Sequence, residues 1–262
     1  MSERWIDLDG AANVRDLGGL PAGSRTVRRN RLIRSDNPQG LTADDVRVLV
    51  DEHDLRAVAD LRTQVEVDLE GPGPLTREPR VAVEHLSLFA EAGEHTDVVA
   101  AEEDGPVVLP WQKRRDDGDR RSAVDVYLRY LDDRPDSVLA ALRLIANTDG
   151  ATIVHCAAGK DRTGVVTALA LAEVGVDRSA IVDDYVATGE RMQRLLDRLK
   201  ASPTYSADVQ RVPDEQHLPR RQTMEGFLAR LDELHGGTAN WLRKHGWTDA
   251  DDAALRTALL PE

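Results

Sequence analysis

The sequence predicts an α/β protein whose central, mostly parallel sheet is flanked by helices on both faces and followed by a helical C-terminal half. Short apolar segments of strand type lie between segments with helical periodicity, and helical periodicity then dominates to the end of the chain. The length of 262 residues allows one sizeable core. The motif spacing favours a single domain over residues 1–262, because the N-terminal segments must reach a strand beyond the midpoint of the chain to complete the sheet.

Each expected element has a local cause in the sequence. Residues 151–155 (Ala-Thr-Ile-Val-His) are apolar and β-branched and follow a turn signal, which is typical of a buried strand. The helix at residues 41–52 has Thr42 as its N-cap, and the helix that starts at Thr163 ends at Gly175. We expect further strands at residues 55–61 and 81–88. We expect further helices at residues 122–131, 136–146, 179–188, 190–200, 222–234, 239–244 and 250–260.

Residues 155–164, His-Cys-Ala-Ala-Gly-Lys-Asp-Arg-Thr-Gly, contain the single cysteine of the chain, Cys156, and place Arg162 six positions after it. They join the expected strand to a helix N-terminus, where unpaired backbone amides and the helix dipole bind anions. The same positive field favours the nucleophilic thiolate form of Cys156. The planar fork of Arg162 can hold two phosphoryl oxygens. The segment therefore predicts phosphoryl transfer to Cys156 rather than a buried structural cysteine.

The other residues of this loop also suit a phosphate site. Ala157 and Ala158 are small and leave the backbone amides accessible, while Gly159 permits a backbone conformation that a Cβ disfavours. Lys160 is one of four lysines among 34 basic residues, which favours a second cation for a multiply phosphorylated or acidic substrate; the alternative is a solvated loop charge. We expect Thr163 to donate its hydroxyl to the cysteine sulfur, to cap the following helix, or both.

The pattern His-Cys-x-x-Gly-Lys-x-Arg-Thr-Gly resembles the signature of cysteine-dependent protein tyrosine phosphatases. Its Gly-Lys-Asp-Arg form is similar to the bacterial tyrosine/serine phosphatase branch that is typified by a mycobacterial enzyme. Other segments share this resemblance, namely residues 13–19 (Asn-Val-Arg-Asp-Leu-Gly-Gly), 32–36, 58–63, 227–231, 235–237 and 241–242. The resemblance spans nearly the whole chain, with residues 91–121 the least matched part.

This resemblance implies a tyrosine phosphatase-like fold and hydrolysis of phosphomonoesters through a cysteinyl-phosphate intermediate, with no metal ion or other cofactor. The substrate that it implies is phosphotyrosine on a protein, with dual specificity and activity on phosphoinositides. Three alternatives stay open. They are a main activity on phosphoinositides, a noncatalytic phosphate-binding module, and sulfur transfer, which also places a cysteine in an anion-binding loop.

Two carboxylates compete for the role of the acid that protonates the leaving oxygen. Asp161 lies inside the loop, and the resemblance implies this role for the aspartate at that position. Asp60 lies at the end of an expected strand, and sites gather at the carboxyl ends of strands in open α/β sheets. The alternative role for Asp60 is structural, for instance to orient Arg62. We expect His155 to hold the loop as a hydrogen-bond donor rather than to shuttle protons.

Other parts of the chain could border the pocket. Four charged residues of the N-terminal motifs either line it or form salt-bridged scaffolding: Arg15, Asp16, Arg34 and Asp36. Residues 91–121, rich in charge and glycine, and residues 201–220, with three prolines, break the pattern of elements. We expect a lid insertion at about residues 90–121, with one or both stretches covering the pocket and shielding the thiolate. The alternative is a solvated insertion.

The composition limits which binding partners and which cellular location we expect. The formal net charge of -13 and the pI of about 5.0 disfavour nonspecific binding of nucleic acid. Residues 1–10 include four charged side chains and lack the apolar core of a signal peptide, and no later segment resembles a membrane span. We therefore expect a cytoplasmic protein without stable membrane insertion, and the resemblance leaves export without a signal open. A single cysteine excludes an internal disulfide.

Overall fold

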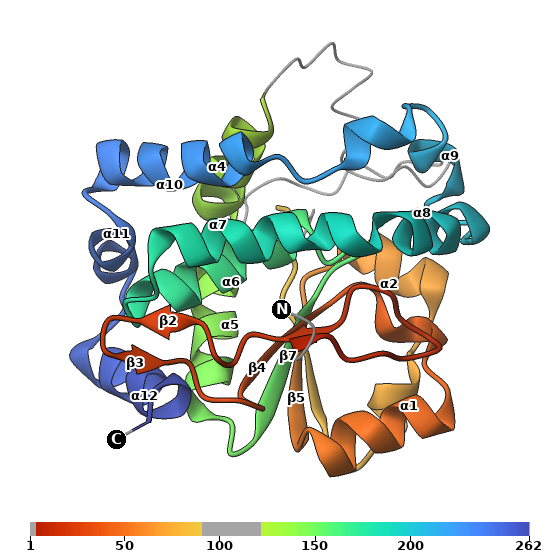
Figure 1. The fold of residues 1–262 in the computed structure, drawn as a ribbon, viewed down its shortest axis with the longest axis horizontal. Helices are drawn as coiled ribbons and strands as arrows, with labels where there is room; N and C mark the ends of the chain where they lie inside the picture. The colour runs from red at the N-terminus through yellow and green to blue at the C-terminus, as the bar shows by residue number, and fades with distance from the viewer. Residues whose placement is uncertain (1–3, 91–121, 262) are drawn as a thin grey trace.

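A five-stranded sheet with the strand order β1-β4-β7-β5-β6 forms the centre of the protein (Figure 1). The structure is a computed structural model, and it describes residues 4–90 and 122–261. The strands are β1 (Arg15–Asp16), β4 (Leu32–Ser35), β7 (Ala151–His155), β5 (Leu55–Asp60) and β6 (Ala82–His85). β1 is antiparallel to β4, and the other neighbouring pairs are parallel. The predicted mostly parallel sheet is therefore confirmed.

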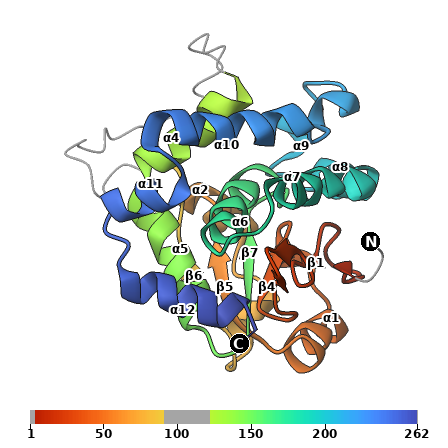
Figure 2. The same cartoon turned by 60° about the vertical axis from the view of Figure 1, so that its left-hand side comes forward.

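Helices cover both faces of the sheet, because neighbouring side chains along each strand enter two different apolar clusters. Val154 of β7 belongs to the larger cluster and the preceding Ile153 to the smaller one. The larger cluster includes side chains of α5 (Pro135–Asn147) and α6 (Asp161–Glu173), whereas α1 (Ala43–Arg47) packs against the smaller cluster. Figure 2 shows α5 and α6 on one side of the strands and α1 on the other.

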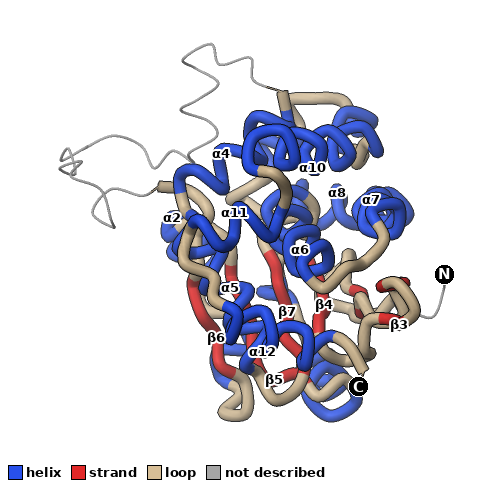
Figure 3. The backbone as a smooth tube through the Cα atoms, turned by 90° about the vertical axis from the view of Figure 1, so that its left-hand side faces the viewer, coloured by secondary structure: helices blue, strands red, loops and turns tan. Residues whose placement is uncertain are grey.

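The remaining elements surround this core. In the first half they are β2 (Pro21–Ala22), β3 (Arg25–Thr26), η2 (Pro38–Gly40), η3 (Val48–Glu52), α2 (Gln64–Glu70), η4 (Pro74–Arg77) and α4 (Ala123–Asp133). The C-terminal half is helical, as predicted, and consists of α7 (Arg178–Ala187), η5 (Thr188–Arg191), α8 (Met192–Ala201), α9 (Ser206–Val209), η6 (Asp214–His217), α10 (Arg221–His235), α11 (Thr238–Lys244) and α12 (Asp249–Leu259). Figure 3 shows α7, α8, α10 and α11 toward the top of the view and α12 across the lower part of the sheet. Helix α10 contacts α4 and α7.

Several elements differ from the sequence expectations. The expected helix at residues 41–52 is α1 followed by the π-type turn η3, with Thr42 as the predicted N-cap. The helix α2 is not among the expected elements, although Thr63 and Glu66 form a capping box at its start. The short strands β1 and β4 are also absent from the expectations. Residues 201–220 contain α9 and η6 instead of an irregular stretch.

The sequence predicts a lid insertion and no membrane-spanning segment. The expected lid insertion at about residues 90–121 falls on residues 91–121, which lie outside the described residues. Across residues 4–90 and 122–261, no helix combines the length and the apolar composition that crossing a bilayer requires.

Candidate active site

The loop after β7 begins where three parallel strands end side by side. Ser35 of β4 and Asp60 of β5 are both register partners of His155, the last residue of β7. Cys156 follows directly and is only 2% exposed, and α6 begins at Asp161. The structure therefore places strand, loop and helix N-terminus in the order that the sequence predicts.

The carbonyl oxygens of this loop are held by other parts of the protein. The oxygen of Ala157 accepts a hydrogen bond of 3.0 Å from a backbone amide that follows β4. The side-chain amide of Asn13 donates to the carbonyls of Ala158 and Gly159, at 3.0 and 3.2 Å. The Arg34 guanidinium donates to the carbonyl of Gly159 at 2.6 Å. Consecutive carbonyl groups of the loop thus have their partners in the scaffold.

The backbone amides of the same loop lack partners. Within the described part of the chain, none of the N–H groups of residues 157–161 donates a hydrogen bond. Amides without partners at a helix N-terminus, with their carbonyls turned to the scaffold, form an anion-binding concavity. The loop can therefore accept the oxygens of a phosphoryl group.

Gly159 permits this loop conformation, as the sequence predicts. Its backbone has a φ of +64°, in the left-handed region that side chains with a Cβ rarely adopt. A Cβ added at this position would lie 2.4 Å from the carbonyl oxygen of Ser35. The loop can therefore approach β4 closely only because residue 159 has no side chain.

Arg34 and Arg15 are positioned by one buried carboxylate, Asp184 of α7. Arg34 donates to Asp184 at 2.7 Å and Arg15 at 2.9 Å, and all three side chains are 1% exposed. Burial alone would raise the pKa of Asp184, but the charges of the two arginines outweigh it and hold the pKa well below its usual range. Arg15 also donates to the side-chain oxygen of Asn13. That bond turns the Asn13 amide toward the loop, so both arginines are scaffolding.

The two acidic residues of the N-terminal motifs also hold backbone segments. Asp36 accepts hydrogen bonds from the amides of Ala12 and Asn13, at 3.0 and 2.9 Å. Asp16 accepts hydrogen bonds from two amides of the segment that connects β1 to β4. Of the two alternatives for this charged set, the geometry favours scaffolding.

Glu66 of α2 holds the guanidinium of Arg162 in a bidentate pair. The two terminal nitrogens of Arg162 donate to its two oxygens at 2.6 and 3.0 Å. Glu66 also accepts hydrogen bonds from the Thr63 amide at 2.8 Å and from the Tyr205 hydroxyl at 3.1 Å. Burial opposes ionisation of both groups, but their mutual attraction lowers the pKa of Glu66 and, with the charge of Cys156, raises that of Arg162. The arginine is therefore charged and fixed within electrostatic reach of Cys156.

Asp161 lies at the start of α6 with its side chain 39% exposed. The hydroxyl of Tyr127 donates a hydrogen bond to its Oδ1, and Lys160 Nζ lies 3.8 Å from the same oxygen. No residue in the described ranges donates to Oδ2. One carboxylate oxygen of Asp161 is thus held, and the other is open to a substrate.

Asp60, the other candidate acid, is bound by Arg62. The Arg62 guanidinium donates to both of its oxygens, at 2.9 and 2.6 Å. Burial would raise the pKa of Asp60, but the neighbouring His155 ring and Arg62 outweigh it and hold the pKa well below its usual range. The His155 ring lies 3.5 Å from Asp60, and burial lowers the pKa of His155 to about 4. Near neutral pH, Asp60 is therefore ionised and His155 is neutral.

Thr163 does not make the contacts expected from the sequence. Its hydroxyl is buried and has no hydrogen-bond partner in the described part of the protein, so the expected bond to the cysteine sulfur is absent. Thr163 does not cap α6 either, because the helix begins two residues earlier, at Asp161. The residue therefore lies in the first helical turn, where its side chain is buried.

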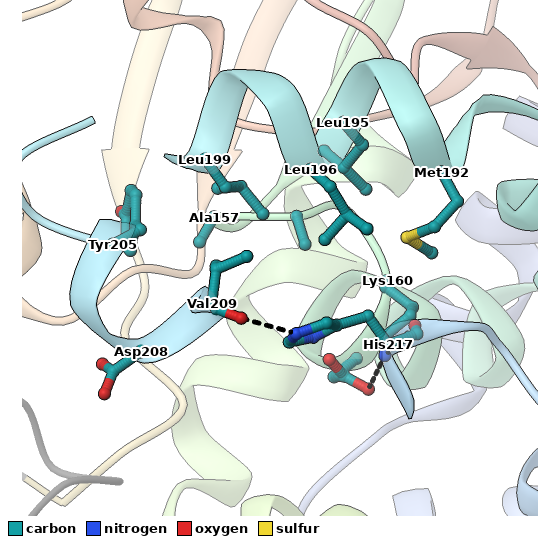
Figure 4. Close-up of a pocket in the computed structure, with 12 residues that line it drawn as sticks. Ala157, Lys160, Met192, Leu195, Leu196, Leu199, Tyr205, Asp208, Val209 and His217 are labelled. Carbon is teal, nitrogen blue, oxygen red and sulfur yellow. Dashed lines mark hydrogen bonds and ion pairs between the residues drawn. The ribbon is translucent and has the colours of Figure 1, made fainter. Parts of the chain in front are cut away.

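Lys160 reaches from the loop to residues 201–220. Its Nζ donates to the carbonyl oxygen of His217 at 2.8 Å. Between the loop and α8 lies a cavity of about 140 Å³. Figure 4 shows its lining, which includes Ala157, Lys160, Met192, Leu195, Leu196, Leu199, Tyr205, Val209 and His217. Part of residues 201–220 therefore folds against the loop.

Four residues of the site were not predicted from the sequence. Asn13 lies in an N-terminal motif but carries no charge that would mark it. Glu66 could have been found from the capping-box pattern with Thr63, three residues before it. Tyr127 belongs to the small set of aromatic residues, which make up 4% of the chain. Asp184 has no local signal, because its partners lie about 150 and 169 residues away.

The geometry defines the class of protein. A cysteine and a fixed arginine share a loop of unpaired amides, and this loop connects a central parallel strand to a helix N-terminus. Such a site can hold a phosphoryl group next to sulfur, and this favours a phosphatase.

The comparisons with known proteins agree with this class. A family model described as "Tyrosine phosphatase family" matches residues 6–261, and the chain belongs to this family. The triple specificity protein phosphatase PtpB of Mycobacterium tuberculosis is 28% identical, over 97% of this chain and 98% of the relative. A Cupriavidus necator protein with a tyrosine-protein phosphatase assignment is 31% identical, over 71% of this chain and 63% of the relative. The family recognised from the sequence is therefore confirmed, and the protein is a phosphatase.

A solved structure is also similar to this chain. It is the core catalytic domain of the PP-IP phosphatase SIW14 from S. cerevisiae, in complex with citrate. The sequence identity is 12% and the TM-score is 0.38, with 87% of this chain and 98% of that chain covered.

We expect Gly159→Ala to lower kcat/KM for p-nitrophenyl phosphate by about 100-fold, because a shift of the loop by about 1 Å misplaces its amides. The added Cβ meets the carbonyl oxygen of Ser35 at 2.4 Å. Gly175→Ala is a matched control: its φ is +86° and nothing lies within 4 Å of the added Cβ. This control introduces similar backbone strain of roughly 1 kcal/mol but should keep its activity. Equal losses of activity in both variants would contradict the argument.

We expect the free energy of unfolding to fall as the pH is lowered from 6.5 to 4, because His155 binds a proton in the unfolded chain while it stays largely neutral in the folded protein. The pKa of about 4 in the folded state lies below the ordinary value of 6.5, so the unfolded chain binds more protons in this window. The loss is on the order of 3 kcal/mol. Urea unfolding at pH 7 and pH 4.5 measures it, and His155→Asn should remove most of the difference. An identical pH dependence in this variant would show that the buried ring does not cause the loss.

Proposed function

We propose that this protein hydrolyses phosphomonoesters through a cysteinyl-phosphate intermediate at Cys156. The observation that carries the proposal is that the backbone amides of residues 157–161 next to this cysteine have no partner in residues 4–90 and 122–261, while the loop carbonyls are bound to the scaffold. Donors that are already in place stabilise developing charge on phosphoryl oxygens without reorganisation. Glu66 holds the Arg162 guanidinium in a fixed orientation, so its positive charge is in place to stabilise phosphoryl oxygens.

The reaction takes place in two displacements. In the first, the Cys156 sulfur attacks phosphorus, the bond from phosphorus to the leaving oxygen breaks, and a carboxylic acid gives its proton to that oxygen. In the second, water attacks phosphorus, the sulfur–phosphorus bond breaks, and the same carboxylate takes a proton from the water. The products are an alcohol or phenol and inorganic phosphate, and the enzyme returns to its starting state.

We propose Asp161 as the acid and base of these two steps. Its carboxylate is partly exposed beside the loop, and its Oδ2 has no donor among the described residues, so this oxygen can face the leaving group and the attacking water. Asp60 is bound by Arg62 through both oxygens, and its pKa lies well below the usual range. A carboxylate held in its ionised form has no proton to give near neutral pH.

Membership of the tyrosine phosphatase family favours hydrolysis over the two alternatives, sulfur transfer and noncatalytic binding of phosphate. Release of phosphate from p-nitrophenyl phosphate, inhibited by vanadate and abolished in Cys156→Ser, is the direct test. Formation of thiocyanate from thiosulfate and cyanide would overturn the proposal in favour of sulfur transfer. Binding of phosphate without turnover would favour the noncatalytic module.

For the substrates, we propose phosphotyrosine in proteins, with phosphoserine, phosphothreonine and phosphoinositides as further substrates. The name of the M. tuberculosis relative, triple specificity protein phosphatase, supports a broad range. Lys160 supports it as well, because it places a second cation at the rim of the loop. The net charge of -13 makes nucleic acid an unfavourable partner.

We also propose that α8 and residues 201–220 act as a cover over the loop. Leu195 and Leu196 of α8 line the cavity together with Tyr205 and Val209, so apolar side chains lie against residues 157–158 of the loop. An apolar cover limits the access of water and oxidants to a thiolate.

We expect Asp161→Asn to lower kcat/KM for an alkyl phosphate by about 100-fold or more, and for p-nitrophenyl phosphate by less than about tenfold. The reason is that p-nitrophenolate departs without a proton, whereas an alkoxide needs one. Asp60→Asn is the matched control, since it makes the same chemical change at the other candidate. Its losses should be proportionally equal for the two substrates. Equal losses in Asp161→Asn would rule this residue out as the acid.

We expect Lys160→Met to lower kcat/KM for a polyphosphorylated inositide by about tenfold and for p-nitrophenyl phosphate by less than about twofold, because only the inositide offers a second anionic group. Lys200→Met is the control: this lysine pairs with Asp214 and lies outside the cavity lining. A panel of phosphotyrosine peptides and mono- and polyphosphorylated inositides measures the effect. A uniform loss over the panel would indicate that Lys160 does not select substrates.

A further inference from the structure

Two buried tyrosines determine which oxygen of the Asp161 carboxylate stays without a hydrogen-bond donor. Tyr127 of α4 is 1% exposed and Tyr185 of α7 is 2% exposed. The Tyr127 hydroxyl donates to Oδ1 of Asp161 and also lies 2.9 Å from the Tyr185 hydroxyl. Three side chains from three different helices thus form one chain of hydrogen bonds that ends at the carboxylate.

The direction of this chain follows from counting protons. A tyrosine hydroxyl has one hydrogen to donate, and an ionised carboxylate can only accept. Because Tyr127 gives its hydrogen to Asp161, the hydrogen between the two tyrosines must come from Tyr185. Burial, with the charge of Asp161, raises the pKa of both hydroxyls well above the ordinary value, so both keep their hydrogens. The hydrogen bonds therefore run from Tyr185 to Tyr127 to Oδ1.

Both tyrosines are held in place by packing. The Tyr127 ring makes edge contacts with Phe227 and Tyr185, at centroid distances of 5.9 and 6.4 Å. The Tyr185 ring lies over Gly164 of α6, where an added Cβ would come within 3.1 Å of it. The absence of a side chain at residue 164 lets α7 bring the Tyr185 ring close to the helix that carries Asp161.

We propose that Tyr127, supported by Tyr185, is a positioning residue for Asp161 that reserves Oδ2 for the transferred proton. This inference rests on the proposed role of Asp161 as acid and base. With Oδ1 occupied by Tyr127 and faced by Lys160, the carboxyl group carries its proton on Oδ2. In the first step this proton goes from Oδ2 to the leaving oxygen. In the second step Oδ2 takes a proton from the attacking water, and Tyr127 keeps its own hydrogen throughout.

The test uses the dependence of kcat/KM on the leaving group. Tyr127→Phe keeps the ring but removes the hydroxyl, and we expect about tenfold lower kcat/KM for an alkyl phosphate and less than about twofold for p-nitrophenyl phosphate. Tyr185→Phe leaves Tyr127 in place and should give a smaller change in the same direction. Ser137→Ala removes a buried hydroxyl of α5 that has no hydrogen-bond partner among the described residues, and the ratio of the two substrates should stay unchanged.

A double-mutant cycle with Asp161→Asn separates the positioning role from the acid itself. In the Asp161→Asn background, Tyr127→Phe should cause no further change in the ratio of the two substrates. A further change of the same size there would overturn the proposal, and so would an equal loss for both substrates in Tyr127→Phe alone. If Asp161→Asn by itself leaves the ratio unchanged, the acid assignment fails, and the positioning role fails with it. Thermal unfolding of each variant shows whether the fold is intact, and Tyr185→Phe decides the question if Tyr127→Phe does not fold.

Discussion

The anchoring of the loop carbonyls is the constraint on which the rest of the site depends. A peptide group is planar, so the direction of each carbonyl also sets the direction of the amide joined to it. Asn13 and Arg34 bind the carbonyls of Ala158 and Gly159, and the amides of the loop are left to an anion. The conformation of this phosphate loop is therefore fixed by side chains that bind its carbonyl groups on the side away from the anion.

This anchoring needs a buried positive charge, and Asp184 makes that burial tolerable. Arg15 and Arg34 are almost fully buried, and an unpaired guanidinium would be strongly destabilising in such surroundings. A pair of this kind contributes little net stability, because desolvation offsets much of the attraction. Its value lies in geometry, since a shared carboxylate between two arginines permits few arrangements. Glu66 likewise pairs with the buried guanidinium of Arg162.

The local features of the site could be predicted from the sequence. The distant residues that hold the site residues in place could not. The strand, the cysteine loop and α6 are contiguous, so spacing and residue type indicate them directly. Two-residue β1 is too short to show alternation, and it forms only because β4 offers an edge. Glu66 lies 96 residues from Arg162, and Tyr127 lies 34 residues from Asp161. Contacts at such separations depend on the packing of helices, which periodicity alone does not specify.

The two aspartates at the site show how surroundings divide one chemical group between two roles. Asp60 is buried with a guanidinium on both oxygens, so its ionised form is held and its negative charge serves to orient Arg62. Asp161 is partly exposed, and its Oδ1 accepts a hydrogen bond from the neutral hydroxyl of Tyr127, with Lys160 Nζ 3.8 Å away. A neutral donor binds a carboxylate oxygen less strongly than a bidentate guanidinium does, and Oδ2 of Asp161 has no donor among the described residues. An acid that must give and then regain a proton therefore needs a partner such as Tyr127 rather than one such as Arg62.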